Sequence, residues 1–89
     1  MRAITPEDAD AVAAMWAQFA AYLRTLGDTD AQVFDAAVFR RDGFGPDPAF
    51  AGLIVEADGR PAGYLLYHFG YDVDRAARLV FIADLWVDP

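Results

Sequence analysis

The chain of 89 residues has no cysteine and no serine, and it has a single histidine, His68. Without cysteine there is no disulfide framework and no thiolate metal site, and without a second histidine we expect no catalytic metal. The absence of serine excludes a serine nucleophile and the Gly-x-Ser-x-Gly pattern that carries it. His68 falls inside an expected strand, where a hydrogen-bonded structural histidine is more typical than a catalytic one.

Basic residues and long hydrophobic runs are also scarce. Seven basic residues oppose fourteen acidic ones, which gives a formal net charge of −7. That charge repels a phosphate backbone, so no nucleic-acid partner is expected, whereas a cationic small molecule is attracted. The simpler interpretation is that acidity keeps an apolar domain soluble. Residues 9–21 are too short and too interrupted to cross a bilayer, and the N-terminus lacks a signal-peptide pattern. We therefore expect a cytoplasmic protein with no membrane partner.

What the chain does contain is apolar surface. Hydrophobic residues make up 56% of the sequence and aromatic residues 15%, which is too rich for a disordered segment. A chain of this length forms one domain at most, and the core that it can bury is marginal. Losing one layer of such a domain would therefore cost a large share of its stability.

The first half of the chain predicts a short strand at 2–5 followed by two helices. Thr5 and Pro6 suit a helix start, and Gly27 suits its end. Between them an apolar stripe recurs at alternating spacings of three and four, which indicates one buried helix face. The stripe consists of Val12, Trp16, Phe19, Leu23 and Leu26.

The second helix is expected to start at Thr29, because Thr29 and Gln32 have the spacing of a capping box. Gly43 is expected to end this helix. Its inner face is expected to consist of Val33, Phe34, Ala37 and Val38.

The second half predicts three strands, at 50–57, 61–71 and 79–87. Asp58-Gly59 between the first two is a strong signal for a two-residue hairpin turn. The last run is almost continuously apolar, and such a strand usually requires cover on both faces. Only two helices precede it, so the sequence predicts an apolar patch that the 89 residues do not cover.

Two segments carry a resemblance to a known family. "DGFGPDPAFAGLIVEADGRPAGYLLYHFGYDV" at 42–73 and "FIADLWVDP" at 81–89, together with the order of the elements, resemble the first half of the GNAT superfamily of N-acetyltransferases. The likeness is to the diamine and polyamine acetyltransferase branch. It implies an α+β fold: a mostly antiparallel sheet in the order strand, two helices, then three strands, with the helices packed on the sheet.

The resemblance also implies an activity and a site. The expected reaction transfers acetyl from acetyl-CoA to a primary amine, with a diamine, a polyamine or an amino-acid-like amine as candidate acceptors. The main chain of Leu85, Trp86 and Val87 is expected to bind the amide-rich arm of acetyl-CoA as an added strand. Asp84 is expected to contact the amine, and the expected acceptor-pocket residues are Tyr22, Tyr67, Tyr71 and Asp84.

Alternatives stand beside each of these roles. Asp84 could instead pair with Arg75 or Arg78 or face outward, and the tyrosines could be packing residues. Ala83 departs from the branch, which often has a glutamate there, so the polyamine assignment is weakened and either another amine substrate or a water relay is indicated.

The family signature continues beyond what these residues contain. The glycine-rich loop that holds the pyrophosphate, the fifth strand and a late tyrosine are not among residues 1–89. The resemblance therefore implies a single, incomplete domain over 1–89, with weak cofactor affinity and little or no catalysis when isolated. The competing hypothesis is a non-catalytic interaction module that pairs through its fourth strand, either with a second copy as a homodimer or with a separate C-terminal half.

Overall fold

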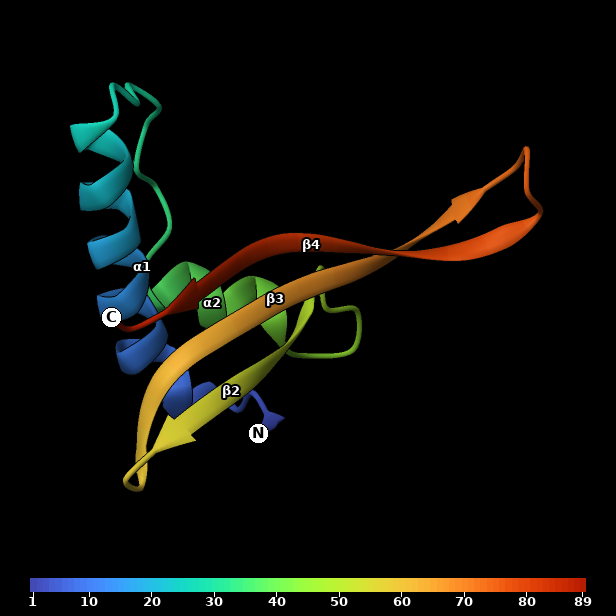
Figure 1. The fold of residues 1–89 in the computed structure, drawn as a ribbon. Coiled ribbons are helices and arrows are strands. Elements are labelled where there is room, and N and C mark those ends of the chain that lie inside the picture. Colours follow the sequence, from blue (N-terminus) through green and yellow to red (C-terminus); the bar gives the residue numbers. More distant parts are fainter.

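The sheet of this α+β fold has four antiparallel strands in the order β1-β2-β3-β4 (Figure 1). The computed structural model describes residues 1–89. The elements are β1 (Arg2–Ala3), a 3₁₀ turn η1 (Pro6–Asp8), α1 (Ala9–Thr25), α2 (Ala36–Gly43), β2 (Ala51–Ala57), β3 (Arg60–Asp72) and β4 (Ala77–Val87). The expected order of one strand, two helices and three strands is confirmed. No helix of the structure is both long and apolar enough to cross a lipid bilayer.

Helix α1 begins and ends near the expected residues. The chain enters it through the 3₁₀ turn at Pro6, whose fixed φ suits a first helical position. At the other end Gly27 adopts φ +95°, and the main-chain N–H groups of Gly27 and Asp28 donate to the carbonyls of Arg24 and Leu23. This is the Schellman arrangement, in which a residue with positive φ closes the last turn.

The N-cap of the second helix lies six residues later than expected. Asp35, not Thr29, is its N-cap, and the Asp35 carboxylate accepts a hydrogen bond of 2.8 Å from the main-chain N–H of Val38. The predicted start at Thr29 was wrong because the segment around it forms a turn instead of a helix. The side chain of Asp28 accepts a hydrogen bond from the main-chain N–H of Asp30, which favours such a turn. Val33, expected on the inner face, is exposed.

The hairpin turn between β2 and β3 is confirmed. Asp58 and Gly59 have φ values of +54° and +75°, and Ala57 pairs with Arg60 across the turn. Positive φ at both central residues is what a type I′ turn requires, and its twist matches that of the two flanking strands.

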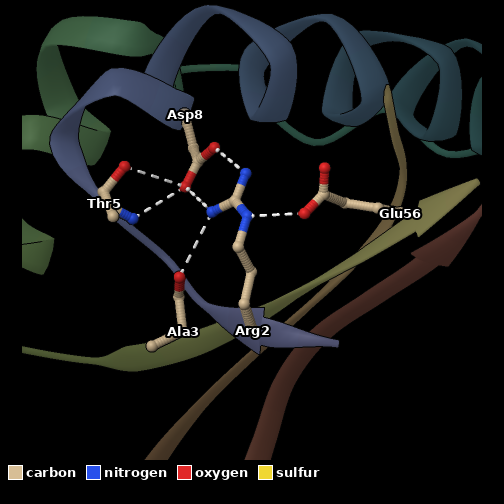
Figure 2. Close-up of polar contacts among 5 residues, drawn as sticks. All are labelled: Arg2, Ala3, Thr5, Asp8 and Glu56. Atoms are coloured by element: carbon tan, nitrogen blue, oxygen red, sulfur yellow. Dashed lines mark hydrogen bonds and ion pairs between the residues drawn. The ribbon is translucent and has the colours of Figure 1, made fainter. Parts of the chain in front are cut away.

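A polar cluster fixes β1 against the start of the helical layer (Figure 2). The Arg2 guanidinium donates to both carboxylate oxygens of Asp8 at 2.8 Å and to Glu56 on β2 at 2.8 Å. Asp8 also accepts from the main-chain N–H and the hydroxyl of Thr5. Because Asp8 is buried, these donors replace the water that its charge has lost, and they hold its pKa below the ordinary value.

The core lies between the sheet and the two helices, on one face only. It joins residues from α1, α2, β2 and β3, with Phe39, Ile54 and Tyr64 fully buried. Its members are Ala9, Val12, Met15, Phe39, Ile54, Tyr64 and Leu66. Both helices therefore cover the face to which Ile54, Tyr64 and Leu66 point.

The opposite face of the sheet is apolar and uncovered. Residues that pair directly across an antiparallel sheet share a face, so Leu85 lies beside Leu65, and Ile82 beside Tyr67. Leu85 and Ile82 are each 56% exposed. The whole structure exposes 6120 Å², whereas a compact monomer of this length exposes roughly 5,200 Å². The expected uncovered apolar patch is thus present.

Part of this extra surface belongs to a two-stranded arm. Strand β2 pairs with β3 only as far as Tyr67, so residues 68–72 and 77–81 continue as an isolated ribbon (Figure 1). Within the arm the rings of His68 and Phe81 stack at 5.2 Å. Phe69 and Val80, which pair on its other face, remain exposed. A two-stranded ribbon is marginally stable by itself.

The Asp8 cluster generates the first prediction. Asp8→Asn removes the charge that Arg2 and Thr5 bind, and the free energy of unfolding should fall by about 2–3 kcal/mol. The measurement is urea unfolding followed by tryptophan fluorescence. Asp47→Asn, which changes an exposed loop carboxylate in the same way, should leave the urea midpoint unchanged.

The pH dependence of this difference has a defined sign. Because folding lowers the pKa of Asp8 from its ordinary value of 3.8, the stabilisation is present above pH 3.8 and disappears as the pH falls through the lower folded value. The wild type and Asp8→Asn should therefore converge in stability below pH 3.8. Equal stability of the two proteins at pH 7 would contradict this role for Asp8.

Candidate functional site

A pocket of about 350 Å³ opens between α1, the two loops that flank α2, and strands β3 and β4. This volume lies within the range of small-molecule sites, which are typically concave and mostly apolar with a few polar groups. Six of its seven lining residues are hydrophobic, and the seventh is Asp84. The lining residues are Trp16, Phe19, Phe34, Phe50, Leu66, Ala83 and Asp84.

A β-bulge in β4 gives the pocket its floor. Asp84 pairs with Leu66 and Ile82 pairs with Tyr67, so Ala83 is an extra residue with no partner on β3. In a regular strand two consecutive side chains point to opposite faces, but here Ala83 and Asp84 both line the pocket. Bulges occur often next to active sites, where they redirect a side chain.

Asp84 is half-buried, and its partner is a tyrosine of the core. The hydroxyl of Tyr64 donates a hydrogen bond of 2.7 Å to Asp84 Oδ2. Tyr64 itself is fully buried, and burial together with this hydrogen bond to Asp84 raises the pKa of the phenol well above 10. Tyr64 is therefore a neutral donor at physiological pH that holds the carboxylate in one orientation. No arginine forms an ion pair with Asp84.

Aromatic rings from three segments form the walls. Trp16 on α1 packs against Phe34 with ring centroids 5.7 Å apart, and Phe34 lies 6.5 Å from Phe50. On the other side Phe19 stacks on Trp86 of β4 at 5.4 Å. The Trp86 indole N–H donates to Asp88, which fixes the ring beside the pocket. A positive group that enters would meet π faces as well as a carboxylate.

The outer edge of β4 has no neighbouring strand. The main-chain N–H of Asp88 donates to Ala62 on β3, and bonded and non-bonded pairs alternate along an antiparallel ladder. The main-chain groups of Trp86 therefore face β3, while those of Leu85 and Val87 face the free edge. An extended, amide-rich group could pair with this edge starting at Leu85, the residue that follows Asp84 of the pocket floor.

The residues predicted from the sequence do not all gather at one place. Asp84 lines the pocket, and Leu85, Trp86 and Val87 follow it directly on β4. Tyr22 is 54% exposed on α1 and does not line the pocket. Tyr67 and Tyr71 lie on the uncovered side of the sheet, because they alternate with the inward-facing Tyr64 and Leu66 along β3.

Neither Arg75 nor Arg78, considered as partners of Asp84, reaches it. Arg75 lies in the turn of the arm, where it pairs with Asp72 at 3.7 Å. Arg78 pairs across the arm with Tyr71, far along β4 from the bulge. The alternative of an outward-facing Asp84 is excluded by its place in the pocket.

Tyr64 and the aromatic walls were missed as site residues. The signal for Tyr64 was available, because a tyrosine in the middle of a core strand needs a partner for its hydroxyl. The wall residues offered no comparable signal. Phe34 and Phe50 are in loops, and Trp16 and Phe19 read as part of the packing stripe of α1.

Comparison with known proteins adds the fold but no activity. Neither a protein-family model nor a curated protein matches the sequence. The chain is similar to the crystal structure of a mutant BH1408 protein from Bacillus halodurans, with a TM-score of 0.75 and 21% sequence identity. The alignment covers 98% of this chain and 60% of that chain, so this chain spans less than two thirds of its neighbour. At this identity the likeness shows a shared fold alone.

The Tyr64–Asp84 bond generates the second prediction. Tyr64→Phe keeps the ring but removes the donor, so the free energy of unfolding should fall by about 1–2 kcal/mol. Tyr71→Phe removes the hydroxyl of an exposed ring that has no hydrogen bond, and it should leave the free energy of unfolding unchanged. Chemical unfolding at pH 7 measures both variants.

The same pair predicts a difference at high pH. Because the folded state raises the pKa of Tyr64 above its ordinary value of 10.0, the unfolded chain loses this proton first, and the wild type loses stability as the pH rises above 10. Tyr64→Phe should lack this part of the loss. The ultraviolet titration curve of Tyr64→Phe can be subtracted from that of the wild type. A phenol that ionises near pH 10 in this difference curve would contradict the raised pKa of Tyr64.

Proposed function

We propose that this chain forms the acceptor-binding part of a GNAT-type N-acetyltransferase, which transfers acetyl from acetyl-CoA to a primary amine. The observation that carries the proposal is the bulge at Ala83. It places a carboxylate in an aromatic pocket, and the same strand continues directly into a free edge that can bind an amide-rich chain. Acceptor and acetyl donor would thus meet on consecutive residues of β4.

For acetyl transfer the protein mainly has to hold the amine next to the thioester and to bind the positive charge of the amine. Asp84 would bind the acceptor nitrogen, and its proton would pass to the carboxylate or to water. The nitrogen lone pair then attacks the thioester carbonyl, a C–N bond forms and the C–S bond breaks, and the departing thiolate takes up a proton. Holding the two reactants side by side supplies much of the rate enhancement in such a transfer.

The arm of acetyl-CoA fits the edge of β4 by its hydrogen-bonding pattern. Its amides can exchange hydrogen bonds with the outward-facing main chain of Leu85 and Val87, as an added strand would. Trp86, the third residue expected there, has its main chain turned toward β3, and its ring stacks on Phe19 behind the pocket wall. The glycine-rich loop that holds the pyrophosphate in the GNAT superfamily is not among residues 1–89, so acetyl-CoA binding by these residues alone should be weak.

A second candidate function is an interaction module. It is favoured by the uncovered apolar face and by the arm, where large side chains such as Phe69 and Val80 remain exposed. The partner would be a second copy or a separately encoded C-terminal half. Sedimentation equilibrium tests the first of these partners, because a chain that stays monomeric over a wide concentration range does not pair with a second copy.

The third prediction concerns acetyl-CoA binding. Calorimetric titration of the folded chain should show saturable but weak binding, with a Kd of about 0.1–1 mM. Leu85→Pro removes one outward N–H without removing a bond to β3, and it should weaken binding at least threefold. Leu85→Ala is the matched control, because it shortens the same side chain and keeps the N–H.

The outcomes separate the candidates. Equal binding by Leu85→Pro and Leu85→Ala would exclude the edge as the cofactor site. No binding by a folded chain would overturn the proposal for these residues and leave the interaction module. Turnover can be followed by release of the CoA thiol with a thiol-specific dye, because the protein has no cysteine of its own to react.

A further inference from the structure

The pocket contains one negative charge and no other polar side chain. Of the fourteen acidic residues in the chain, Asp84 alone lines it. The four ion pairs of the structure are elsewhere and use other carboxylates. Asp84 is thus a half-buried carboxylate that no arginine neutralises, held by the neutral hydroxyl of Tyr64. A cation is the ligand that compensates such a charge.

The remaining walls accept an apolar body rather than a second charge. Leu66 and Ala83 lie next to Asp84 on the floor, and the aromatic walls surround them. A ligand with a second ammonium would have to place it against these groups, where it would lose water and gain no carboxylate. An aromatic or branched apolar body would instead bury surface against the rings and add the attraction between rings and its ammonium group.

The net charge of the chain cannot by itself favour a ligand with one positive charge over a ligand with two. A net charge of −7 attracts a dication more strongly than a monocation, so steering alone would favour diamines. Any preference for a singly charged amine must therefore come from the pocket. A preference that arises from direct contacts in the pocket should persist at high salt. Long-range attraction by the net charge should not, because it is screened within about 8 Å at physiological ionic strength.

We propose that this pocket selects a primary amine with a single positive charge and an aromatic-sized apolar body, and that it discriminates against diamines and polyamines. Asp84 binds the ammonium, Ala83 leaves room beside it, and the rings of Trp16, Phe19, Phe34 and Phe50 enclose the body. That the selected amine is the acetyl acceptor rests on the acetyl transfer proposed above. That the pocket binds such an amine does not depend on acetyl-CoA.

The test uses three probes that separate charge from apolar body. 2-Phenylethylamine has both, 2-phenylethanol lacks the charge, and 1,4-diaminobutane lacks the body and has two charges. Binding to the whole chain is measured by calorimetry and by tryptophan fluorescence, at low and at high salt. The expected result is that 2-phenylethylamine binds at least tenfold more tightly than either of the others.

Two variants test the roles of single residues. Asp84→Asn keeps an oxygen that can accept from Tyr64, so the fold should survive. The affinity for 2-phenylethylamine should then fall to that for 2-phenylethanol, whose own affinity should not change. Ala83→Glu places a second carboxylate beside Asp84 and should raise the affinity for 1,4-diaminobutane at least tenfold relative to 2-phenylethylamine.

Each outcome decides the matter. Equal affinities for 2-phenylethylamine and 2-phenylethanol, or tighter binding of 1,4-diaminobutane by the wild type, would overturn the proposal. If 2-phenylethylamine binds as expected but acetyl-CoA does not bind to the folded chain, the pocket's selectivity stands and the acetyltransferase function fails. If acetyl transfer is observed and diamines are the better acceptors, the function stands and this inference fails.

Discussion

The burial of the Tyr64 hydroxyl is the constraint on which both the core and the site depend. Its ring is at the centre of the core, in the layer that β2, β3 and both helices share. A buried hydroxyl without a partner would cost much of the small stability that such a chain can have. Asp84 satisfies it at 2.7 Å, which requires that the carboxylate point inward. The same bond that completes the core therefore brings a negative charge into the pocket.

A second constraint is the imbalance between the two faces of the sheet. One face carries two helices, a polar cluster at Arg2 and Asp8, and the pocket. The other presents Leu65, Ile82 and Leu85 without cover. Contiguous exposed apolar patches mark protein or membrane contact surfaces, ligand grooves or surfaces that are prone to aggregation. The exposed face and the free edge of β4 are adjacent, so whatever covers one would also affect access to the other.

The sequence predicted the parts of the fold that depend on local rules. The turn at Asp58-Gly59 follows from two residues that tolerate positive φ, and the end of α1 follows from Gly27. The start of α2 was predicted wrongly, because Thr29 and Asp35 offer competing local signals. Asp84 was predicted as a site residue from family resemblance. Its partner and the aromatic walls required the three-dimensional contacts, since Trp16, Phe34 and Phe50 share no spacing or motif.

The bulge at Ala83 also determines how β4 can change over evolutionary time. Before the bulge the even-numbered residues Val80 and Ile82 lie on the uncovered face of the sheet. After it the odd-numbered residues Leu85 and Val87 lie on that face. Deleting one residue anywhere between Ile82 and Asp84 would restore regular alternation and turn one end of the strand over. Either the arm or the pocket floor would then present the wrong side chains. Loss of a single residue at the bulge would therefore turn side chains that now face the core toward solvent, and the reverse.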